Sequence, residues 1–326
     1  MPSILSIIWN NKFNLPPLPA PNTFLGKSVL ITGATSGIGY ATAVHFANLS
    51  AKSVIITGRS LAKGELAKAR IEGETSTIGK NIVRCMELNM STFETINEFA
   101  GKVTRDIQEI DFVCLNAGAI STKHRLGKEG YESMIEISVL GTSFLALLLL
   151  PWMKEVGRGN SHLGIVDYIG TLTFPIGQKI MFSNIGARRR TERADRYAVN
   201  EIAKLALRTD GTPNVIVNSI CPGMVKSDLG REYNTGVVIG IMINLWMSLA
   251  CKTTEGGART YVLAALTPSS EHGAHYTNYE TEENYKNSVG HNIFGDEGQN
   301  MQAQVWKEVL KIVDKKYSAA VERADS

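Results

Sequence analysis

The 326-residue sequence predicts an α/β fold: a single doubly wound parallel sheet with helices on both faces. Two observations predict it. Short, continuously apolar runs, such as 29–31 and 53–57, alternate with segments of helical pattern, which is typical of parallel strands covered on both faces. The first of these runs leads directly into a glycine-rich turn at 32–39 that opens a helix.

The remaining elements follow the same alternation. Strands are expected at 29–31, 53–57, 82–86, 111–115, 162–166 and 215–220, and helices at 40–49, 61–71, through Phe99, at 139–152, from Tyr197 and at 301–313. Pro16, Pro17, Pro19 and Pro21 favour extended backbone, so residues 1–24 are expected to form an arm without a helix. One domain over 25–315 and a charged tail over 316–326 complete the prediction.

Composition excludes several classes of protein. Lys plus Arg is 34 and Asp plus Glu is 31, and a net charge of +3 is too small to indicate a nucleic-acid partner. The four cysteines lie far apart without a CxxC pair, which indicates reduced thiols in a cytoplasmic type of compartment. The six histidines show no metal-ligand spacing, so we expect no metal.

Two long apolar runs, at 139–152 and 236–251, are both shorter than the ~20 residues of a spanning helix. We therefore expect no stable membrane span and interpret both as buried helices. A membrane-surface helix remains an alternative for the second run. The apolar patch at 4–9 lacks the basic flank of a secretion signal.

The turn at 32–39 reads TGATSGIG, and its residue types suit a dinucleotide. Gly33 and Gly39 permit a tight turn and close backbone approach, and Gly37 removes a Cβ that would collide with a pyrophosphate. The free N–H groups and positive dipole end of the following helix attract phosphates. The candidate cradle comprises Gly33, Thr35, Ser36, Gly37, Ile38 and Gly39.

Together with NAG at 116–118 and the helix led by Tyr197, this turn resembles the short-chain dehydrogenase/reductase family over about residues 25–315. ELNMS at 87–91, DRY at 195–197, CPGMVKSDLGRE at 221–232 and TTEGGARTYVLAAL at 253–266 are similar to its fungal members. The resemblance implies a single Rossmann-type domain and an NAD(P)(H) site.

The resemblance also implies roles for individual residues. Asn116, with Ala117 and Gly118, would line the adenosine side, and Asn89, with Met90, would lie next to the adenine, where the family usually has Asp. Arg59 follows the second strand, and a cation there pairs with a 2′-phosphate, so NADP(H) is preferred over NAD(H). A solvated surface charge is the alternative for Arg59.

On the nicotinamide side, the resemblance places Pro222, Gly223 and Val225 in the loop beside the ring and gives Ser227 a bond to the carboxamide. The family works with Asn, Ser, Tyr and Lys, and here Tyr197 matches its tyrosine. Position 201 is Glu rather than Lys, on the same helix face. A carboxylate opposes ionisation of a phenol, where an ammonium favours it.

Lys204, about 4.5 Å further along this helix, shares the face and is a weak substitute that is expected to pair with Glu201. Tyr168 stands where the family has Ser, preceded by Asp167, and Thr171 fits only after a register shift. Ser138 stands where the family has Asn. Three of four catalytic residues are therefore replaced, and ordinary carbonyl reduction is expected to be slow, since losing one acid–base group costs ~10²–10⁴ in rate.

We expect Asp167, Tyr168, Tyr197 and Glu201 to cluster around the substrate and to move protons. The run at 236–251, within a lid at about 228–252, would offer Met242, Trp246 and Met247 to a lipophilic ligand; core packing or a dimer face is the alternative.

Three functions follow from this pattern. The first is a natural-product type of enzyme that binds NADP(H) and catalyses a non-redox isomerisation, dehydration or cyclisation of a lipophilic small molecule. The second is an NADPH-dependent ketoreductase or dehydrogenase with a substituted proton relay. The third is a non-catalytic binding protein. A homodimer through the helices at 139–152 and 197–208 is possible in this family.

Overall fold

The computed structural model describes residues 4–119, 125–157, 159–167, 194–227, 237–277, 281–288 and 291–325. A seven-stranded parallel sheet, in the order β3-β2-β1-β4-β5-β6-β7, forms its centre and confirms the predicted fold class. The strands are β1 Ser28–Ile31, β2 Ser53–Gly58, β3 Val83–Glu87, β4 Phe112–Leu115, β5 Ser161–Val166, β6 Val215–Ile220 and β7 His275–Tyr276. The sequence predicted six of them and missed the two-residue β7.

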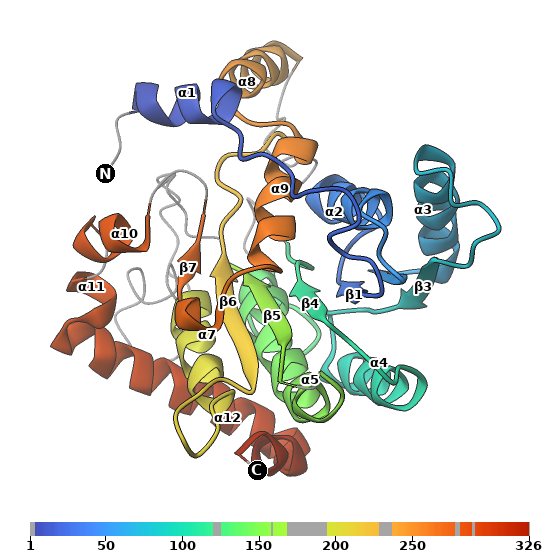
Figure 1. Ribbon diagram of the computed structural model, residues 1–326. Helices are drawn as coiled ribbons and strands as arrows, with labels where there is room; N and C mark the ends of the chain where they lie inside the picture. The colour runs from blue at the N-terminus through green and yellow to red at the C-terminus, as the bar shows by residue number, and fades with distance from the viewer. Residues whose placement is uncertain are drawn as a thin grey trace.

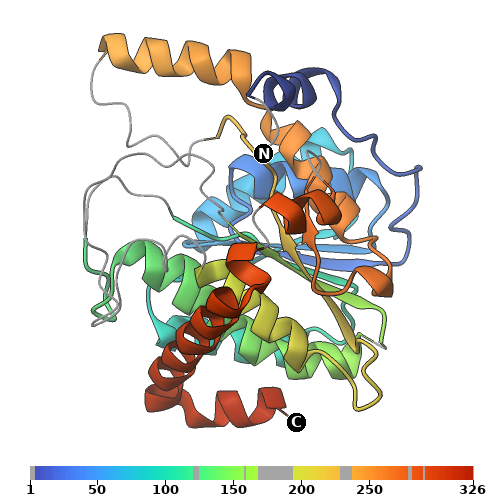
Figure 2. The same ribbon diagram turned by 90° about the vertical axis from the view of Figure 1, so that its left-hand side faces the viewer.

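Helices cover both faces of the sheet (Figures 1 and 2). One face carries α4 Phe93–Asp106, α5 Thr142–Val156, α7 Ala194–Leu205 and α12 Asp296–Asp325. The other carries α2 Gly37–Asn48, α3 Leu61–Glu74 and α9 Thr254–Ala264. Shorter or peripheral elements are α1 Ile4–Phe13, the π-helix η1 Ile135–Gly141, α8 Val237–Ala250, the 3-10 turn η3 Ser269–Glu271, α10 Glu282–Ser288 and α11 His291–Phe294.

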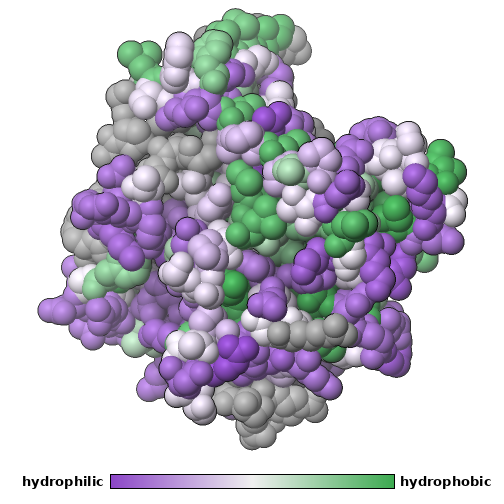
Figure 3. Space-filling view, in the orientation of Figure 1, coloured by the Kyte–Doolittle hydropathy of each residue, from purple (hydrophilic) through white to green (hydrophobic). Residues whose placement is uncertain are grey.

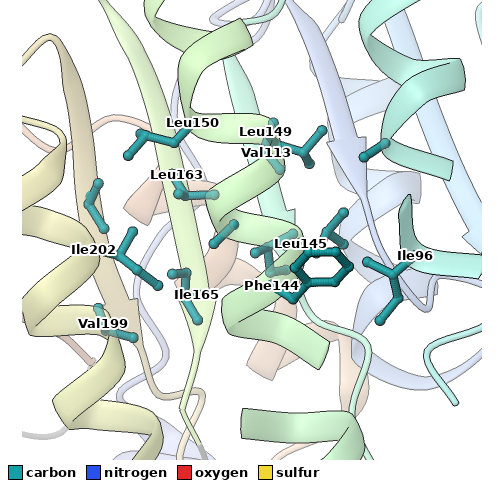
Figure 4. Close-up of a cluster of buried hydrophobic side chains, with 14 of the residues drawn as sticks. Ile96, Val113, Phe144, Leu145, Leu149, Leu150, Leu163, Ile165, Val199 and Ile202 are labelled. Atoms are coloured by element: carbon teal, nitrogen blue, oxygen red, sulfur yellow. The ribbon is translucent and has the colours of Figure 1, made fainter. Parts of the chain in front are cut away.

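The core lies on both sides of the sheet, which explains why the strands are continuously apolar. Leu30 of β1 belongs to the cluster under α4 and α5, whereas its neighbours Val29 and Ile31 belong to the cluster under α2 and α9. Figure 4 shows Phe144 and Leu145 of α5 within the first cluster. The helical stretch Ile135–Val156 is long and apolar enough to cross a membrane, but 78% of its apolar segment is buried inside the protein.

The C-terminal helix α12 covers α5 and α7 with its own apolar side chains. Val305, Val309 and Val313 are buried in the same cluster as the α5 leucines. This chain's own C-terminal helix therefore covers part of the two helices that we named for a homodimer. The helix is also longer than the predicted 301–313, with non-helical backbone at Tyr317.

Two predictions are wrong, one about the N-terminal arm and one about the apolar run at 236–251. The arm contains the helix α1, because it ends at Phe13 and Pro16 restricts only its own neighbourhood. The run at 236–251 forms α8, but α8 is not buried: Ile241, Leu245 and Leu249 are 60–64% exposed. Composition shows that a helix is apolar, and it does not show that anything covers it.

Candidate functional site

The glycine-rich turn between β1 and α2 has the backbone that the motif requires. Gly33 and Gly37 have φ of +66° and +63°, which side-chain-bearing residues rarely adopt. A Cβ on Gly33 would lie 2.9 Å from the Cα of Ala117, and one on Gly39 would lie 2.6 Å from Nδ2 of Asn116. Around Gly37 there is open space for 4 Å, at the first turn of α2. The turn is therefore packed beneath and open above, as a pyrophosphate cradle must be.

Side chains from distant strands and helices hold this turn in place. Nδ2 of Asn116 donates to the carbonyl oxygens of Thr32 at 2.8 Å and Gly33 at 3.2 Å. The hydroxyl of Tyr261, on α9, donates to Oδ1 of Asn116 at 3.1 Å, and the N–H of Gly33 donates to Oγ1 of Thr57 at 3.1 Å. The Asn116 amide thus braces the turn, a role that the sequence did not predict, and its predicted place on the adenosine side stays a prediction. Sequence reasoning missed Thr57 and Tyr261.

The predicted adenosine-side residues lie at the same edge of the sheet. β2 and β3 pair in parallel, with Gly58 opposite Glu87, so Arg59 and Asn89 both follow the carboxyl ends of adjacent strands. Arg59 is exposed, and Oδ1 of Asn89 accepts a hydrogen bond from the Ser91 N–H at 3.1 Å. Met90 is buried, Ser36 is exposed, and Thr35, Ile38 and Gly118 are half-buried along this edge.

Ser138 lies in the π-helix η1, close to the end of β4. Its Oγ accepts a long hydrogen bond from the N–H of Ala119 at 3.4 Å. The structure thus brings Ser138 next to the residue that follows the NAG segment. Single π-turns of this kind often accompany functional sites.

Tyr197 and Glu201 lie on successive turns of α7. The Tyr197 side chain is 2% exposed, within the core cluster under α5. Oε1 of Glu201 accepts from Nζ of Lys204 at 2.7 Å and from Nε2 of Gln302, on α12, at 2.5 Å. The expected pairing of Lys204 with Glu201 is therefore formed, and the Lys204 side chain is 63% exposed.

Asp167 belongs to a different environment, a buried polar cluster between the ends of β5, β6 and β7. The Ser219 hydroxyl donates to its carboxylate, and Nδ1 of His275 lies 3.6 Å from the same oxygen. Burial, reinforced by the positive charge of Arg196, lowers the pKa of His275 to about 3, so its ring is neutral. Its ring stacks on Tyr285 with centroids 4.3 Å apart.

The two carboxylates expected in the acid–base cluster have different hydrogen-bond partners. Asp167 bonds within the sheet, and Glu201 bonds to Lys204 and α12. Tyr168, Thr171 and the part of the lid at 228–236 lie outside the described residues, and so does the side chain of Met242.

One further residue, Lys252, was missed by the sequence reasoning. It is 1% exposed, and its Nζ donates to the carbonyl of Pro222 at 2.5 Å. Burial lowers its pKa to about 8. Its backbone N–H and carbonyl bond to Met224 and Lys226 at 2.9 Å each, so the end of the lid is joined to the loop expected beside the nicotinamide. A lysine after an apolar run gives no local signal of this role.

In that loop Pro222 is buried, Gly223 has φ of +74°, and Ser227 is half-buried. Val225 packs against α9, since a Cβ on Gly257 would lie 2.7 Å from its Cγ2. Among the described residues, no group of three or more His, Cys, Asp or Glu side chains could hold a metal ion.

Comparisons with known proteins show the family of this chain. A family model described as short chain dehydrogenase matches residues 27–162. The short-chain dehydrogenase/reductase phmF of Phaeosphaeria nodorum is 30% identical over 323 residues, which cover 94% of this chain and 92% of the relative. The short-chain dehydrogenase/reductase ffsI of Aspergillus flavipes is 28% identical, covering 96% and 93%.

Solved structures show the same fold. L-sorbose reductase from Gluconobacter frateurii, solved with NADPH and L-sorbose, superposes with a TM-score of 0.59 at 20% identity, covering 79% of this chain and 97% of the reductase. At that identity the likeness concerns the fold alone.

Proposed function

The chain belongs to the short-chain dehydrogenase/reductase family, and from that premise we propose that it is a natural-product type of enzyme that binds NADP(H) and moves protons on a lipophilic substrate. The reaction class is isomerisation, dehydration or cyclisation. One observation carries the proposal: the position one turn after Tyr197 holds an anion, Glu201, whose carboxylate is bonded to Lys204 and Gln302. No cation reaches the nicotinamide ribose from that position.

The residues present fit the phosphate end of the cofactor. The open space at Gly37 and the first turn of α2 suit a pyrophosphate. The exposed Arg59 at the same edge suits a 2′-phosphate, which favours NADP(H) over NAD(H). When bound, this cofactor supplies or accepts a hydride. The complex of L-sorbose reductase with NADPH supports the choice only by likeness of fold.

The chain's own residues favour proton transfer. With the family's lysine replaced at position 201, no ammonium there favours ionisation of the Tyr197 phenol, and we assign this phenol the role of proton donor. Replacing the family's lysine takes away a group of the proton relay, and losing one such group lowers the rate of an acid–base step by ~10²–10⁴. The two relatives described above are fungal, which agrees with a role in secondary metabolism. All four cysteines are free, which suits a cytoplasmic enzyme.

A second candidate, an NADPH-dependent ketoreductase, is favoured by Lys252. Its buried amine lies on the carbonyl of Pro222, in the loop where the family holds the nicotinamide. With its pKa lowered to about 8, it remains largely protonated at neutral pH and places a positive charge near the reacting end of the site.

The test incubates the full chain with a panel of lipophilic polycyclic ketones and enols, with NADPH, with NADP⁺ or without nucleotide. The proposal expects products of equal mass, or lighter by one water, in equal amounts with NADPH and NADP⁺, without change in the nicotinamide absorbance. Tyr197→Phe should abolish this product. Stoichiometric consumption of one NADPH per product would instead establish the ketoreductase.

A further inference from the structure

Two apolar helices from opposite parts of the chain lie side by side at one end of the molecule (Figures 1 and 2). Nδ2 of Asn11, on α1, donates to the carbonyl of Ala250 at the end of α8, at 2.9 Å. Their exposed large apolar residues form what we call the apolar pad: Leu5, Trp9, Phe13, Ile241, Leu245, Trp246 and Leu249, between 43% and 75% exposed.

This exposure is concentrated. Seven of the fifteen large hydrophobic residues that are exposed in the described chain lie on these two helices. α8 reads VVIGIMINLWMSLA and carries no charge, and α1 carries only Lys12. Figure 3 shows hydrophobic atoms over this end of the molecule. A concentration of exposed apolar side chains on two neighbouring helices indicates an interaction site, because leaving this surface in water is unfavourable.

We propose that the apolar pad seats the enzyme on a lipid bilayer, with α1 and α8 lying in the interfacial layer. The fourteen residues of α8 extend about 21 Å, which is too short to cross a hydrocarbon core of about 30 Å. A short uncharged helix is instead suited to lie along the surface. Trp9 and Trp246, one on each helix, are the side chains that membrane interfaces favour.

The charges beside the pad identify the lipid. Nζ of Lys12 donates to the Ser248 carbonyl at 2.7 Å, and Nζ of Lys226 donates to the Ser248 hydroxyl at 2.7 Å. Two cations thus meet at the border of the pad, and neither α1 nor α8 contains an acidic residue. This border complements anionic phospholipid head groups. A second copy of the chain would bring the same cations and repel.

The pad is directly connected to the candidate site. Lys226 and Lys252 bond through their backbones, and Lys252 holds the carbonyl of Pro222. A lipophilic substrate dissolved in the bilayer would therefore meet the enzyme near its site. The inference goes beyond the proposed function and does not depend on which reaction the enzyme catalyses.

The test is flotation of the full chain with vesicles of phosphatidylcholine alone or with about 30% phosphatidylserine. We expect binding to both, stronger with phosphatidylserine and with that advantage lost at high salt. Leu245→Ser with Leu249→Ser should lower the partition coefficient at least tenfold. Leu61→Ser with Leu66→Ser, two exposed leucines on α3, is the matched control and should bind as the native chain does.

Lys12→Gln with Lys226→Gln should remove only the phosphatidylserine advantage. Lys226 and the two α8 leucines are exposed, whereas Lys12 is half-buried and also donates to the Cys251 carbonyl at the end of α8, so circular dichroism is used to check that every variant is folded. Three outcomes overturn the proposal, and the first two are no binding to either vesicle and binding that the double serine variant of α8 leaves unchanged. A dimer in light scattering that this variant dissociates would also overturn it, since the pad would then be a protein interface. None of these readouts requires catalytic activity.

Discussion

Nζ of Lys204 lies 2.7 Å from Oε1 of Glu201, so the anion that replaces the family's lysine has a cation of its own. Because the Lys204 side chain is 63% exposed, this pair contributes little stability. Gln302 donates to the same oxygen and ties it to α12. The carboxylate is therefore fixed in place without being essential to the fold, and position 201 can be changed in experiments.

Glu201→Lys should raise the rate of NADPH oxidation with lipophilic ketones at least tenfold. An ammonium one turn after Tyr197 favours ionisation of the phenol and is able to reach the ribose. Glu201→Gln, which removes the anion without adding a cation, should give a smaller rise. The measurement is the decay of nicotinamide absorbance. Equal rates in the native chain and in Glu201→Lys would show that the missing lysine is not what limits hydride chemistry.

Gly37→Val should weaken NADPH binding more than tenfold, because its side chain would fill the open space above the turn. Gly79 provides a matched control. It has φ of +76° and open space around it, and it lies away from the site, between α3 and β3. Both valines should cost roughly 1–2 kcal/mol in unfolding free energy through the backbone alone. Only Gly37→Val should affect a fluorescence titration with NADPH; a similar loss in Gly79→Val would remove the support for the cradle.

The glycine-rich turn was predictable because its determinants are local. Strand, turn and helix occupy consecutive residues, and the positive φ of Gly33 and Gly37 requires glycine whatever else the chain does. What braces the turn was not predictable. Tyr261 meets Asn116 across 145 residues, and no local pattern specifies that contact.

The same distinction explains the errors at α1 and α8 and the partner of Glu201 that the sequence did not predict. An apolar run predicts a helix, but its burial depends on what packs against it, and the exposed residues of α8 remain uncovered in the part of the chain that the structure describes, although α1 packs against this helix. The partner of Glu201 on α12 lies 101 residues later. Helix periodicity placed Glu201 on the face of Tyr197 and predicted Lys204 beside it, and it carried no information about Gln302.

Arg59→Gln should raise the Kd of NADPH about tenfold and leave the Kd of NADH unchanged, since only NADPH carries the 2′-phosphate. Lys63→Gln, at another exposed cation in the first turn of α3, is the control and should alter neither value. Both constants come from the same fluorescence titration. If the two cofactors weaken in parallel, Arg59 does not contact the phosphate.

Lys252→Met removes the bond to the Pro222 carbonyl and should raise the KM for NADP(H) more than it lowers kcat.

Lys252→Met should also change the pH dependence of stability. Burial lowers the lysine pKa from 10.5 to about 8, so between these values the unfolded chain binds a proton that the folded chain has released. Unfolding free energy therefore rises across this range by at most about 1.4 kcal/mol per pH unit. Lys252→Met should remove this rise, and Lys226→Met should keep it.

His275 should make the fold sensitive to acid. Burial is the main cause that lowers its pKa from 6.5 to about 3. Between these two pH values the ring binds a proton in the unfolded chain and stays neutral in the folded chain. Stability is complete above pH 6.5 and falls with decreasing pH, by at most about 1.4 kcal/mol per pH unit. Urea unfolding of His275→Gln should show a shallower fall. Some slope should persist, because burial also lowers the pKa of His162 and His272. An unchanged slope would mean that His275 accepts its proton within the fold, beside Asp167.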